Sequence, residues 1–252
     1  MEPGIVTRVS DGTATVTLSH PAKRNAMTTE MWRELPPLLD RLAADRAVRA
    51  LVLTGAGGTF CAGADIGSLR GSAGAGTGKG LATAAEEALA AFPKPTLAAI
   101  RGYCVGGGCQ LAAACDLRFA EEGARFGVTP AKLGIVYPAS ATRRLVRLVG
   151  PSAAKYLLFS GELIDCARAL RTGLLDEVLP EGELDKRVAD FTAVLASRSQ
   201  LTQAAAKEFA DGRADAERVA HWEEQAGESG DTAEGVAAFL ERRTPRFTWT
   251  AR

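Results

Sequence analysis

The sequence predicts an α/β protein whose last quarter is wholly helical. Short apolar segments alternate with helix-prone segments through the first two-thirds of the chain, the order expected when helices cover a largely parallel sheet. A strand, a glycine-rich turn and a helix follow one another twice, at 50–66 and at 96–115. Only helical segments are expected near the C-terminus. We therefore divide the chain into a core of residues 1–197 and a C-terminal helical region of residues 198–252.

The N-terminal segment is predicted to form a β-hairpin. Apolar residues alternate or nearly alternate in Ile5–Val9 and Thr13–Ser19. Asp11-Gly12, which lies between them, favours the two-residue turn of a hairpin. A buried strand at 50–54 then leads into the first glycine-rich turn.

A helix is expected from Thr28 or Thr29 to about Ala44. Either threonine can accept a hydrogen bond from a first-turn amide, and leucines recur along one face of the segment. Pro36-Pro37 lacks two backbone donors, which predicts a kink or a break at that point.

The remaining elements follow from apolar runs and from the positions of glycine and proline. Strands are expected at 96–100, 116–120 and 124–127, and helices at 81–92, 111–115, 139–149, 152–159, 165–171, 184–196, 202–210, 216–224 and 233–243. The segment 67–80, rich in Gly, Ser, Ala and Thr, is predicted to be a mobile loop. It is not a Walker A phosphate loop, because Ala73 and Gly80 stand where that motif needs Gly and Ser or Thr.

The bulk composition predicts a cytoplasmic protein with a buried core. Of 252 residues, 46% are hydrophobic and 24% are charged, and the formal net charge is zero. This balance disfavours nucleic acid or an anionic membrane as the main partner. No apolar run approaches the roughly 18–20 residues of a membrane span, and the N-terminus lacks the features of a signal peptide.

The five cysteines and two histidines predict neither a metal site nor a disulfide framework. The cysteines form no CxxC pair, and their apolar or glycine-rich neighbours favour buried free thiols. His20 and His221 have no nearby ligand partner in the sequence, so a zinc site or a Ser-His triad is not expected.

The glycine-rich stretch Arg101–Gln110 is the strongest candidate for a functional turn. An apolar run at 96–100 precedes three consecutive glycines, and a helix-prone segment follows them. This order leaves backbone N–H groups free at a helix N-terminus, where they can bind a phosphate or a developing oxyanion. The alternative is that the glycines serve only a tight turn or close packing.

Several local motifs, taken together and in this order, resemble the crotonase family, also called the enoyl-CoA hydratase/isomerase superfamily. They are Pro21–Ala26, Phe60–Ile66, Pro93–Thr96, Gly102–Leu111, Cys115-Asp116, Phe126-Gly127, Leu133–Pro138, Leu145–Gly150 and Glu234–Arg243. The resemblance implies a crotonase-type spiral of ββα units and a C-terminal all-helical region that forms homotrimers, often paired into hexamers. It also implies a coenzyme A thioester that enters as the substrate, so no separate cofactor is expected.

The resemblance further implies a two-amide oxyanion hole. In the family, two backbone N–H groups polarise the thioester carbonyl and hold the enolate, and the matching positions are Ala64 and Gly107. The positions expected to bind substrate and coenzyme A are Lys23, Arg24, Ala62, Ala64, Ile66, Gly106, Gly107, Gln110 and Pro130. Lys23 and Arg24 can instead be solvated loop charges. From a neighbouring subunit, the C-terminal residues Arg243, Arg246 and Phe247 can add contacts.

Two departures from the family pattern bear on the reaction. Hydratases of the family use two glutamates as general base and general acid, and Gln110 and Pro130 stand at those positions. An amide does not exchange a proton near neutral pH, and proline has no polar side-chain atom. Because each acid–base group typically contributes about 10²–10⁴-fold to the rate, efficient hydration is not expected. The backbone oxyanion hole survives both substitutions.

The string Thr129–Tyr137 resembles the methylmalonyl-CoA decarboxylase branch of the family. This implies that Tyr137 is catalytic, donating a hydrogen bond or a proton. The same branch has His at the position of Ala64 and Glu at that of Gln110, which departs from the sequence here. Tyr137 can instead be a half-buried ring with a solvated hydroxyl group.

Other acidic residues leave the reaction open. Glu86 and Glu87, in the helix after the 67–80 segment, can supply a carboxylate from a new direction or form a solvated helix face. Asp65 and Asp116 are interpreted as structural, holding loops and helix ends through backbone hydrogen bonds. We therefore expect an enzyme that stabilises a thioester enolate, with isomerase or decarboxylase/lyase chemistry. The alternative is a non-catalytic acyl-CoA-binding protein.

Overall fold

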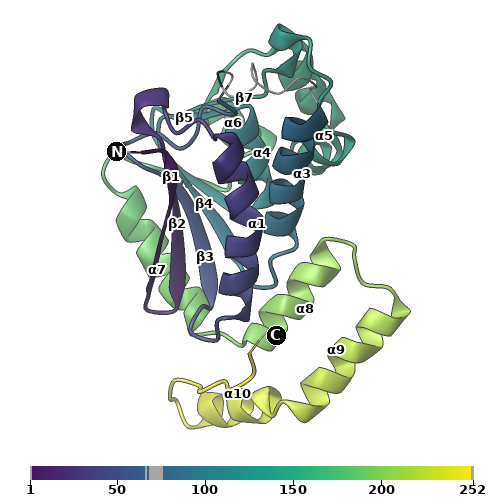
Figure 1. Ribbon diagram of the computed structural model, residues 1–252. Helices are drawn as coiled ribbons and strands as arrows, with labels where there is room; N and C mark the ends of the chain where they lie inside the picture. Colours follow the sequence, from purple (N-terminus) through teal and green to yellow (C-terminus); the bar gives the residue numbers. More distant parts are fainter. Residues whose placement is uncertain (1, 66, 68–75, 251–252) are drawn as a thin grey trace.

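The computed structural model describes residues 2–65, 67 and 76–250, and its centre is a six-stranded sheet in the order β1-β2-β3-β4-β6-β9 (Figure 1). These strands are β1 (Gly4–Ser10), β2 (Thr13–Ser19), β3 (Ala50–Gly55), β4 (Thr96–Ile100), β6 (Leu117–Glu121) and β9 (Glu177–Leu179). Only β1 and β2 pair antiparallel; every other neighbouring pair in this sheet is parallel. A three-stranded sheet of β5 (Tyr103–Val105), β7 (Arg125–Gly127) and β8 (Ile164–Asp165) lies at one end.

Helices cover both faces of the large sheet. The helices are α1 (Thr29–Ala44), α3 (Gly76–Ala90), α4 (Gly107–Ala114), α5 (Ala139–Ser160), α6 (Cys166–Thr172), α7 (Leu184–Ala196), α8 (Gln200–Ala210), α9 (Ala216–Glu228) and α10 (Asp231–Leu240). Short 3₁₀ segments lie at Pro21–Lys23 and Pro130–Leu133. The main core packs α1, α3 and α4 on one face, and a smaller cluster packs α7 on the other. This arrangement confirms the predicted α/β class.

The predicted hairpin is confirmed. Ser10 pairs with Thr13, so Asp11 and Gly12 alone form the turn, both with positive φ (51° and 77°). That is the geometry which an Asp-Gly turn favours. The strands at 50–54 and 96–100 are also confirmed, and the two predicted helices at 139–149 and 152–159 form α5, which is interrupted by non-helical backbone at Gly150.

The predicted break at Pro36-Pro37 is wrong. The helix α1 runs through both prolines, with the Thr28 side chain accepting a hydrogen bond from Met31 N–H. Buried leucines on its inner face, Leu35 and Leu38 among them, hold the helix against the core. Tertiary packing thus outweighs the loss of two backbone donors.

Two helix starts and three short strands are the main differences from the sequence prediction. The helix α3 begins at Gly76, inside the segment predicted as a loop, and 68–75 lies outside the described residues. The helix α4 begins at Gly107, four residues earlier than expected. The short strands β5, β8 and β9 were not predicted, because segments of two or three residues carry no apolar period.

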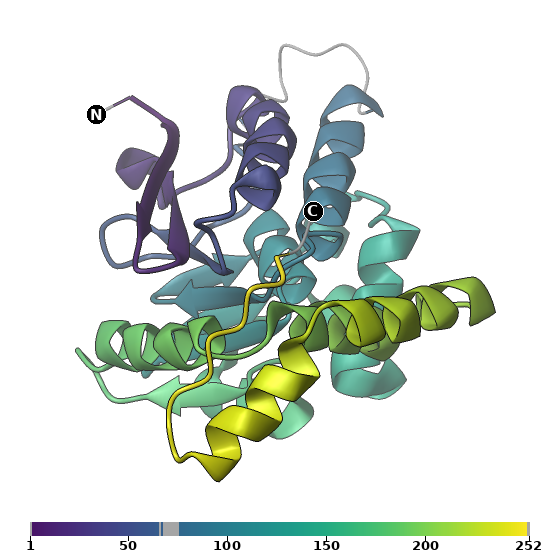
Figure 2. The same cartoon turned by 90° about the horizontal axis from the view of Figure 1, so that it is seen from below.

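The helices α8–α10 lie beyond the end of the sheet that is opposite to β5 (Figures 1 and 2). Lys207 of α8 joins them to the core, because its Nζ donates to Asp116 Oδ2 (2.9 Å) and to Lys94 O (3.1 Å). Asp116 Oδ2 also accepts from Thr96 N–H (2.7 Å). These contacts fit the structural role predicted for Asp116.

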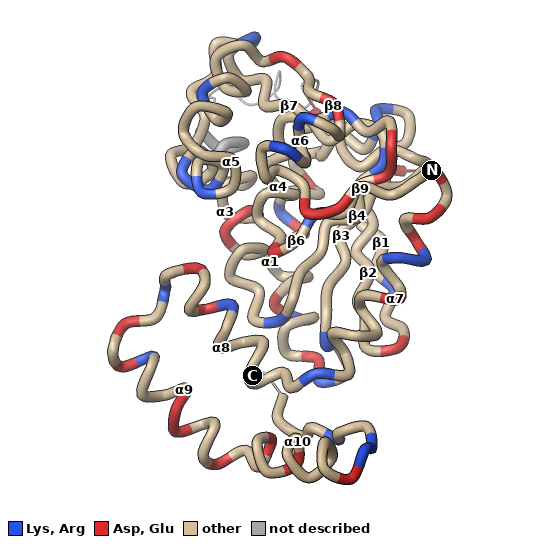
Figure 3. Tube along the Cα trace, turned by 180° about the vertical axis from the view of Figure 1, so that it is seen from behind, with Lys and Arg blue, Asp and Glu red and all other residues tan. Residues whose placement is uncertain are grey.

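Charges of both signs are interspersed along the chain (Figure 3). This mixture fits the formal net charge of zero. No helix in the described ranges is both long enough and apolar enough to cross a bilayer.

Candidate active site

Two turns at the same end of the sheet are brought together by backbone pairing. Cys61, after β3, forms a parallel bridge with Cys104 of β5, and Val105 N–H donates to Cys61 O (2.9 Å). Ala64 and Gly107 each follow a bridge residue by three positions. The pairing therefore places their two amides beside each other.

The amides of Ala64 and Gly107 have no acceptor among the described residues. Met27 N–H donates to Gly63 O and Asp65 N–H donates to Met27 O, each at 2.8 Å, so the bridge to Met27 leaves Ala64 N–H unused. Gly107 is the first residue of α4, where an N–H group has no intrahelical acceptor. Two free donors thus converge, and such a pair can stabilise an oxyanion.

Glycine is required at Gly106 and Gly107 for two different reasons. Gly106 has φ 55° and ψ −119°, a region that residues with a Cβ rarely adopt, and its N–H donates to Gly127 O (2.8 Å). At Gly107, an added Cβ would lie 2.9 Å from Trp32 Cζ2 and 3.6 Å from Ala64 N. Any side chain there would meet Trp32 and crowd the space in front of the two amides.

Asn25 fixes the loop that borders this site. The residue is fully buried with φ 58°, and its Nδ2 donates to Ala56 O (2.7 Å) and Thr59 O (2.6 Å). Its Oδ1 accepts from His20 N–H (2.9 Å). One amide side chain thereby holds the end of β2 to the segment that leads from β3 to Ala64.

The two free amides border a cavity of about 180 Å³. Its lining residues are Met27, Thr29, Trp32, Ala62, Gly63, Ala64, Leu81, Ala82, Gly106, Gly107, Gln110, Thr129, Pro130, Leu133, Ile135, Val136, Tyr137 and Pro138. The wall is mostly apolar, as small-molecule sites are. None of these described residues is a carboxylate, a histidine or a lysine.

A carboxylate lies behind the cavity wall, against Gln110. Gln110 Nε2 donates to Glu86 Oε2 at 2.5 Å, and Arg144 Nη1 donates to Glu86 Oε1. Glu86 has no exposed surface, whereas half of the Glu87 side chain is exposed, and Arg144 Nη2 lies 3.4 Å from it. Burial raises the pKa of Glu86, while Gln110 and Arg144 oppose the shift. Neither Glu86 nor Glu87, the two candidate acids from the sequence, lines the cavity.

Tyr137 lines the cavity and is partly buried. Burial raises the pKa of its hydroxyl well above the usual range, and the negative charge of Glu86 adds to that rise. The hydroxyl is therefore protonated at neutral pH. It can donate a hydrogen bond or a proton to a group in the cavity, but it cannot serve as a base.

The predicted cationic residues lie at the edge of the site and are engaged with neighbours. Lys23 Nζ pairs with Asp65 Oδ2 (2.7 Å), which lowers the pKa of that carboxyl. The Arg24 guanidinium lies 4.6 Å from the centre of the Tyr103 ring. Arg24 O accepts a hydrogen bond from Ala62 N–H (3.0 Å). Ala62 lies on the cavity wall, whereas Lys23 and Arg24 do not.

Other predicted residues are not brought to the site of this chain. Ile66 lies outside the described residues. Arg243 pairs with Glu234 of α10, and the tail that contains Arg246 and Phe247 stays beside α10, at the opposite end from the two amides. Contacts to a neighbouring subunit's site remain a prediction.

All five cysteines are buried and free, as predicted. Burial raises the pKa of Cys61 and of Cys115 to about 12. A thiol in that state is a poor nucleophile. Cys61, Cys104 and Cys109 belong to the main core, so they pack behind the two turns.

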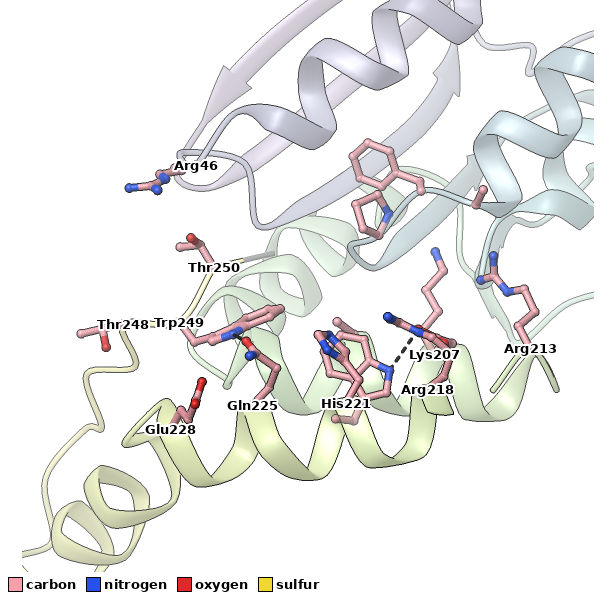
Figure 4. Close-up of a pocket in the computed structure, with 16 residues that line it drawn as sticks. Arg46, Lys207, Arg213, Arg218, His221, Gln225, Glu228, Thr248, Trp249 and Thr250 are labelled. Carbon is pink, nitrogen blue, oxygen red and sulfur yellow. Dashed lines mark hydrogen bonds and ion pairs between the residues drawn. The ribbon is translucent and has the colours of Figure 1, made fainter. Parts of the chain in front are cut away.

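A larger cavity of about 990 Å³ lies between the core and the C-terminal helices (Figure 4). Arg46, Lys207, Arg213, His221 and Trp249 are among the residues that line it. Lys207 is already bound to Asp116. We place the candidate site at the smaller cavity, because the two free amides converge there.

Several residues of the site had no signal in the sequence. Trp32 looked like any apolar residue of the α1 face, and Arg144 like any surface charge of α5. Their roles depend on contacts between helices far apart in the chain. Asn25 could have been noticed, since it is the only asparagine in the sequence and lies within the motif Pro21–Ala26.

Comparison with known proteins gives matches over nearly the whole chain. The family model described as enoyl-CoA hydratase/isomerase matches residues 8–250. The 2,3-dehydroadipyl-CoA hydratase of Escherichia coli strain K12 is 34% identical over 92% of this chain and 93% of that protein. The crotonyl-CoA hydratase of Syntrophomonas wolfei is 32% identical over 96% and 97%.

Solved structures agree with these matches. A crystal structure described as an enoyl-CoA hydratase/isomerase family member has a TM-score of 0.91 at 37% identity, covering 100% of this chain and 99% of that one. The enoyl-CoA hydratase from Bacillus anthracis has a TM-score of 0.88 at 31% identity, covering 96% and 98%.

Proposed function

The chain belongs to the enoyl-CoA hydratase/isomerase family, and we propose that it is an enzyme that binds an acyl-CoA thioester with the carbonyl oxygen on the Ala64 and Gly107 amides. The observation that carries the proposal is the convergence of these two unpartnered N–H groups on one apolar cavity. One such donor can stabilise a transition-state oxyanion by about 3–4 kcal/mol. Coenzyme A enters as part of the substrate, so the reaction needs no separate cofactor.

The reaction passes through a thioester enolate. If C2 of the acyl group bears a carboxylate, the bond from C2 to that carboxylate breaks, CO₂ leaves, and the electron pair of the bond forms the enolate. The Tyr137 hydroxyl then donates a proton to C2 and regains one from water. In double-bond isomerisation the proton leaves C2 and returns at C4, which needs a base that the described cavity wall does not supply. Decarboxylation therefore fits these residues better than isomerisation does.

Water addition is the reaction that the site supports least. Gln110 and Pro130 line the cavity at the two positions where hydratases of the family have glutamate. Neither side chain can take a proton from water. The relatives named as hydratases thus share the fold and the thioester ligand with this chain, and we propose that its acid–base chemistry differs.

The second candidate function is a non-catalytic acyl-CoA-binding protein. The cavity wall without carboxylates among its described residues favours this candidate. Tyr137 argues against it, because its hydroxyl is protonated at neutral pH and lies at the cavity wall, where it can donate a proton to a strongly basic enolate.

We also propose that the chain assembles in the cytoplasm as a homotrimer or as a pair of trimers through its C-terminal helices. Phe239 and Leu240 of α10 are 82% and 74% exposed, and Val236 on the same helix is 56% exposed. Large apolar side chains left in water on one helix mark an interaction surface. Light scattering at micromolar concentration should give three or six times the chain mass; a monomer would contradict the assembly.

The function is tested with a panel of crotonyl-CoA, a 3-enoyl-CoA and methylmalonyl-CoA, followed by product analysis. We expect turnover of methylmalonyl-CoA that falls at least about tenfold in Tyr137→Phe, with hydration of crotonyl-CoA close to background. Binding of all three without turnover would select the non-catalytic candidate. Absence of binding to any thioester would contradict the proposal.

A further inference from the structure

Glu86 is a fully buried carboxylate that is hydrogen-bonded to a residue of the cavity wall. Its two oxygens accept from Gln110 Nε2 and from Arg144 Nη1. Gln110 is itself 5% exposed and lines the cavity, whereas Glu86 does not line it. Among the described residues of the wall, Gln110 is the one that Glu86 contacts by a hydrogen bond, and the charge of Glu86 also acts on Tyr137 through space.

The contact fixes which end of the Gln110 amide faces the carboxylate. An ionised carboxylate only accepts hydrogen bonds, so the amide must turn its Nε2 toward Glu86. The carbonyl oxygen, Oε1, is then directed away from Glu86. Arg144 pairs with the other carboxylate oxygen and favours the charged form of Glu86, so the donor end of the amide is the one that can face it.

The position of Gln110 in α4 places this acceptor close to the thioester. Gln110 follows Gly107 by three residues, so both face the same side of the helix. Gly107 and Gln110 also line the same cavity, so with the thioester carbonyl on Gly107 N–H, as proposed, an acyl chain that follows the cavity wall would pass Gln110. A hydrogen-bond donor on those carbons can reach Oε1.

We infer that Glu86 is a positioning residue that holds Gln110 Oε1 as a fixed acceptor on the cavity wall, and that the site selects acyl-CoA thioesters with a hydroxyl group near the thioester carbonyl. The inference rests on the proposed thioester binding at Ala64 and Gly107. It assigns to Gln110 a role in specificity where the family has a proton-transfer group, and it gives Glu86 a role without contact to substrate.

The test compares two ligands that differ by one hydroxyl group, 3-hydroxybutyryl-CoA and butyryl-CoA, by isothermal titration calorimetry. We expect the wild-type protein to bind the hydroxylated ligand about tenfold more tightly, the effect of one hydrogen bond to a fixed, buried acceptor. In Glu86→Gln, either end of the amide at 110 can face position 86. The preference should then fall below about threefold, while the dissociation constant of butyryl-CoA changes less than about twofold.

Glu87→Gln is the matched control. It lies on the same helix, next to Glu86, and removes an exposed partner of the same arginine. The tenfold preference should persist in this variant. Gln110→Met, which keeps the length of the side chain but lacks an acceptor amide, provides a second test if Glu86→Gln does not fold; its preference should also be lost.

The possible outcomes distinguish a failure of this inference from a failure of the proposed function. Equal binding of the two ligands by the wild type, or a preference retained in both Glu86→Gln and Gln110→Met, would overturn the inference and leave the proposed function intact. Failure of both thioesters to bind the wild type would overturn the proposed function, and the inference with it.

Discussion

The nitrogen of Ala64 lies 3.6 Å from the point that a Cβ on Gly107 would occupy, although 43 positions separate the two residues in the chain (107 minus 64). The bridge between Cys61 and Cys104 creates this proximity. The backbone therefore sets the relative position of the two amides, and the Trp32 side chain bounds the space beside them. A single methyl group there has a large effect.

Gly107→Ala is expected to weaken thioester binding while the protein remains folded. The added Cβ would lie 2.9 Å from Trp32 Cζ2 and within contact of Ala64 N. The methyl group should keep the carbonyl oxygen from at least one amide, so we expect the affinity for butyryl-CoA, measured by titration calorimetry, to fall about tenfold or more, the scale of one hydrogen bond. The control is Gly227→Ala in α9, where an added Cβ meets nothing within 4 Å; its affinity should be unchanged. Wild-type affinity in Gly107→Ala would contradict the assignment of these amides.

Gln110→Glu should not by itself make an efficient hydratase. It would place a second carboxyl group within hydrogen-bond distance of Glu86, and two such groups cannot both ionise at low cost. The shared proton raises a folded-state pKa above the unfolded value. Stability is then highest in acid and is lost as the pH rises through that pKa. Urea unfolding at pH 5 and pH 8 should show this loss in the single variant.

Adding Glu86→Gln to Gln110→Glu should relieve the repulsion. The pH-dependent loss of stability should disappear, and the carboxyl at the cavity wall can then ionise. We expect hydration of crotonyl-CoA, followed by ultraviolet absorbance, to rise about tenfold or more over the single variant. Equal hydration by the single and double variants would show that Glu86 does not control the charge at position 110.

Asn25→Asp should destabilise the protein by about 2–4 kcal/mol. Asn25 donates to Ala56 O and Thr59 O from a fully buried position, and a carboxylate there would face two carbonyl oxygens without a donor of its own. Urea unfolding measures the change in the free energy of unfolding. Lys23→Gln, in the same loop, removes only an exposed ion pair with Asp65 and should stay within about 1 kcal/mol of the wild type.

Acid should release the C-terminal tail from α10. The hydrogen bonds that Glu234 accepts from Arg243 and from the backbone N–H of Arg246 lower the pKa of its carboxyl from 4.5 to about 2. Because the folded-state pKa lies below the unfolded value, this contribution is present above about pH 4.5 and is lost as the pH falls toward 2.

Trp249, at the end of the tail, reports this release. Its Nε1 donates to Gln225 Oε1 (3.1 Å) and its ring lies 6.0 Å from that of Trp222. The fluorescence difference between the wild type and Trp249→Phe should change between pH 4.5 and 2, and in Glu234→Gln it should already be changed at pH 7. Glu223→Gln, an exposed residue of α9, should behave as the wild type. A pH-independent signal in the wild type would contradict the assigned role of Glu234.

The sequence allowed the α/β class, the hairpin, most helices and both turns of the site to be predicted, since each depends on local pattern or on a family motif. Of the kink or break predicted at Pro36-Pro37, the break is wrong, because the core contacts of Leu35 and Leu38 outweigh a local rule. Glu86 was recognised as a candidate, but its role was not. The role of Glu86 depends on its contacts with Gln110 of α4 and Arg144 of α5. A local sequence pattern cannot predict a contact among three helices.

The contact between Glu86 and Gln110 also constrains how this chain can diverge. If position 110 becomes an acid first, two carboxyl groups lie side by side and the fold is destabilised. If position 86 loses its charge first, the Gln110 amide is no longer held in one orientation. Neither order is neutral, so the two positions are expected to change together over evolutionary time. Among relatives with an acid at position 110, the position matching 86 should hold a neutral residue.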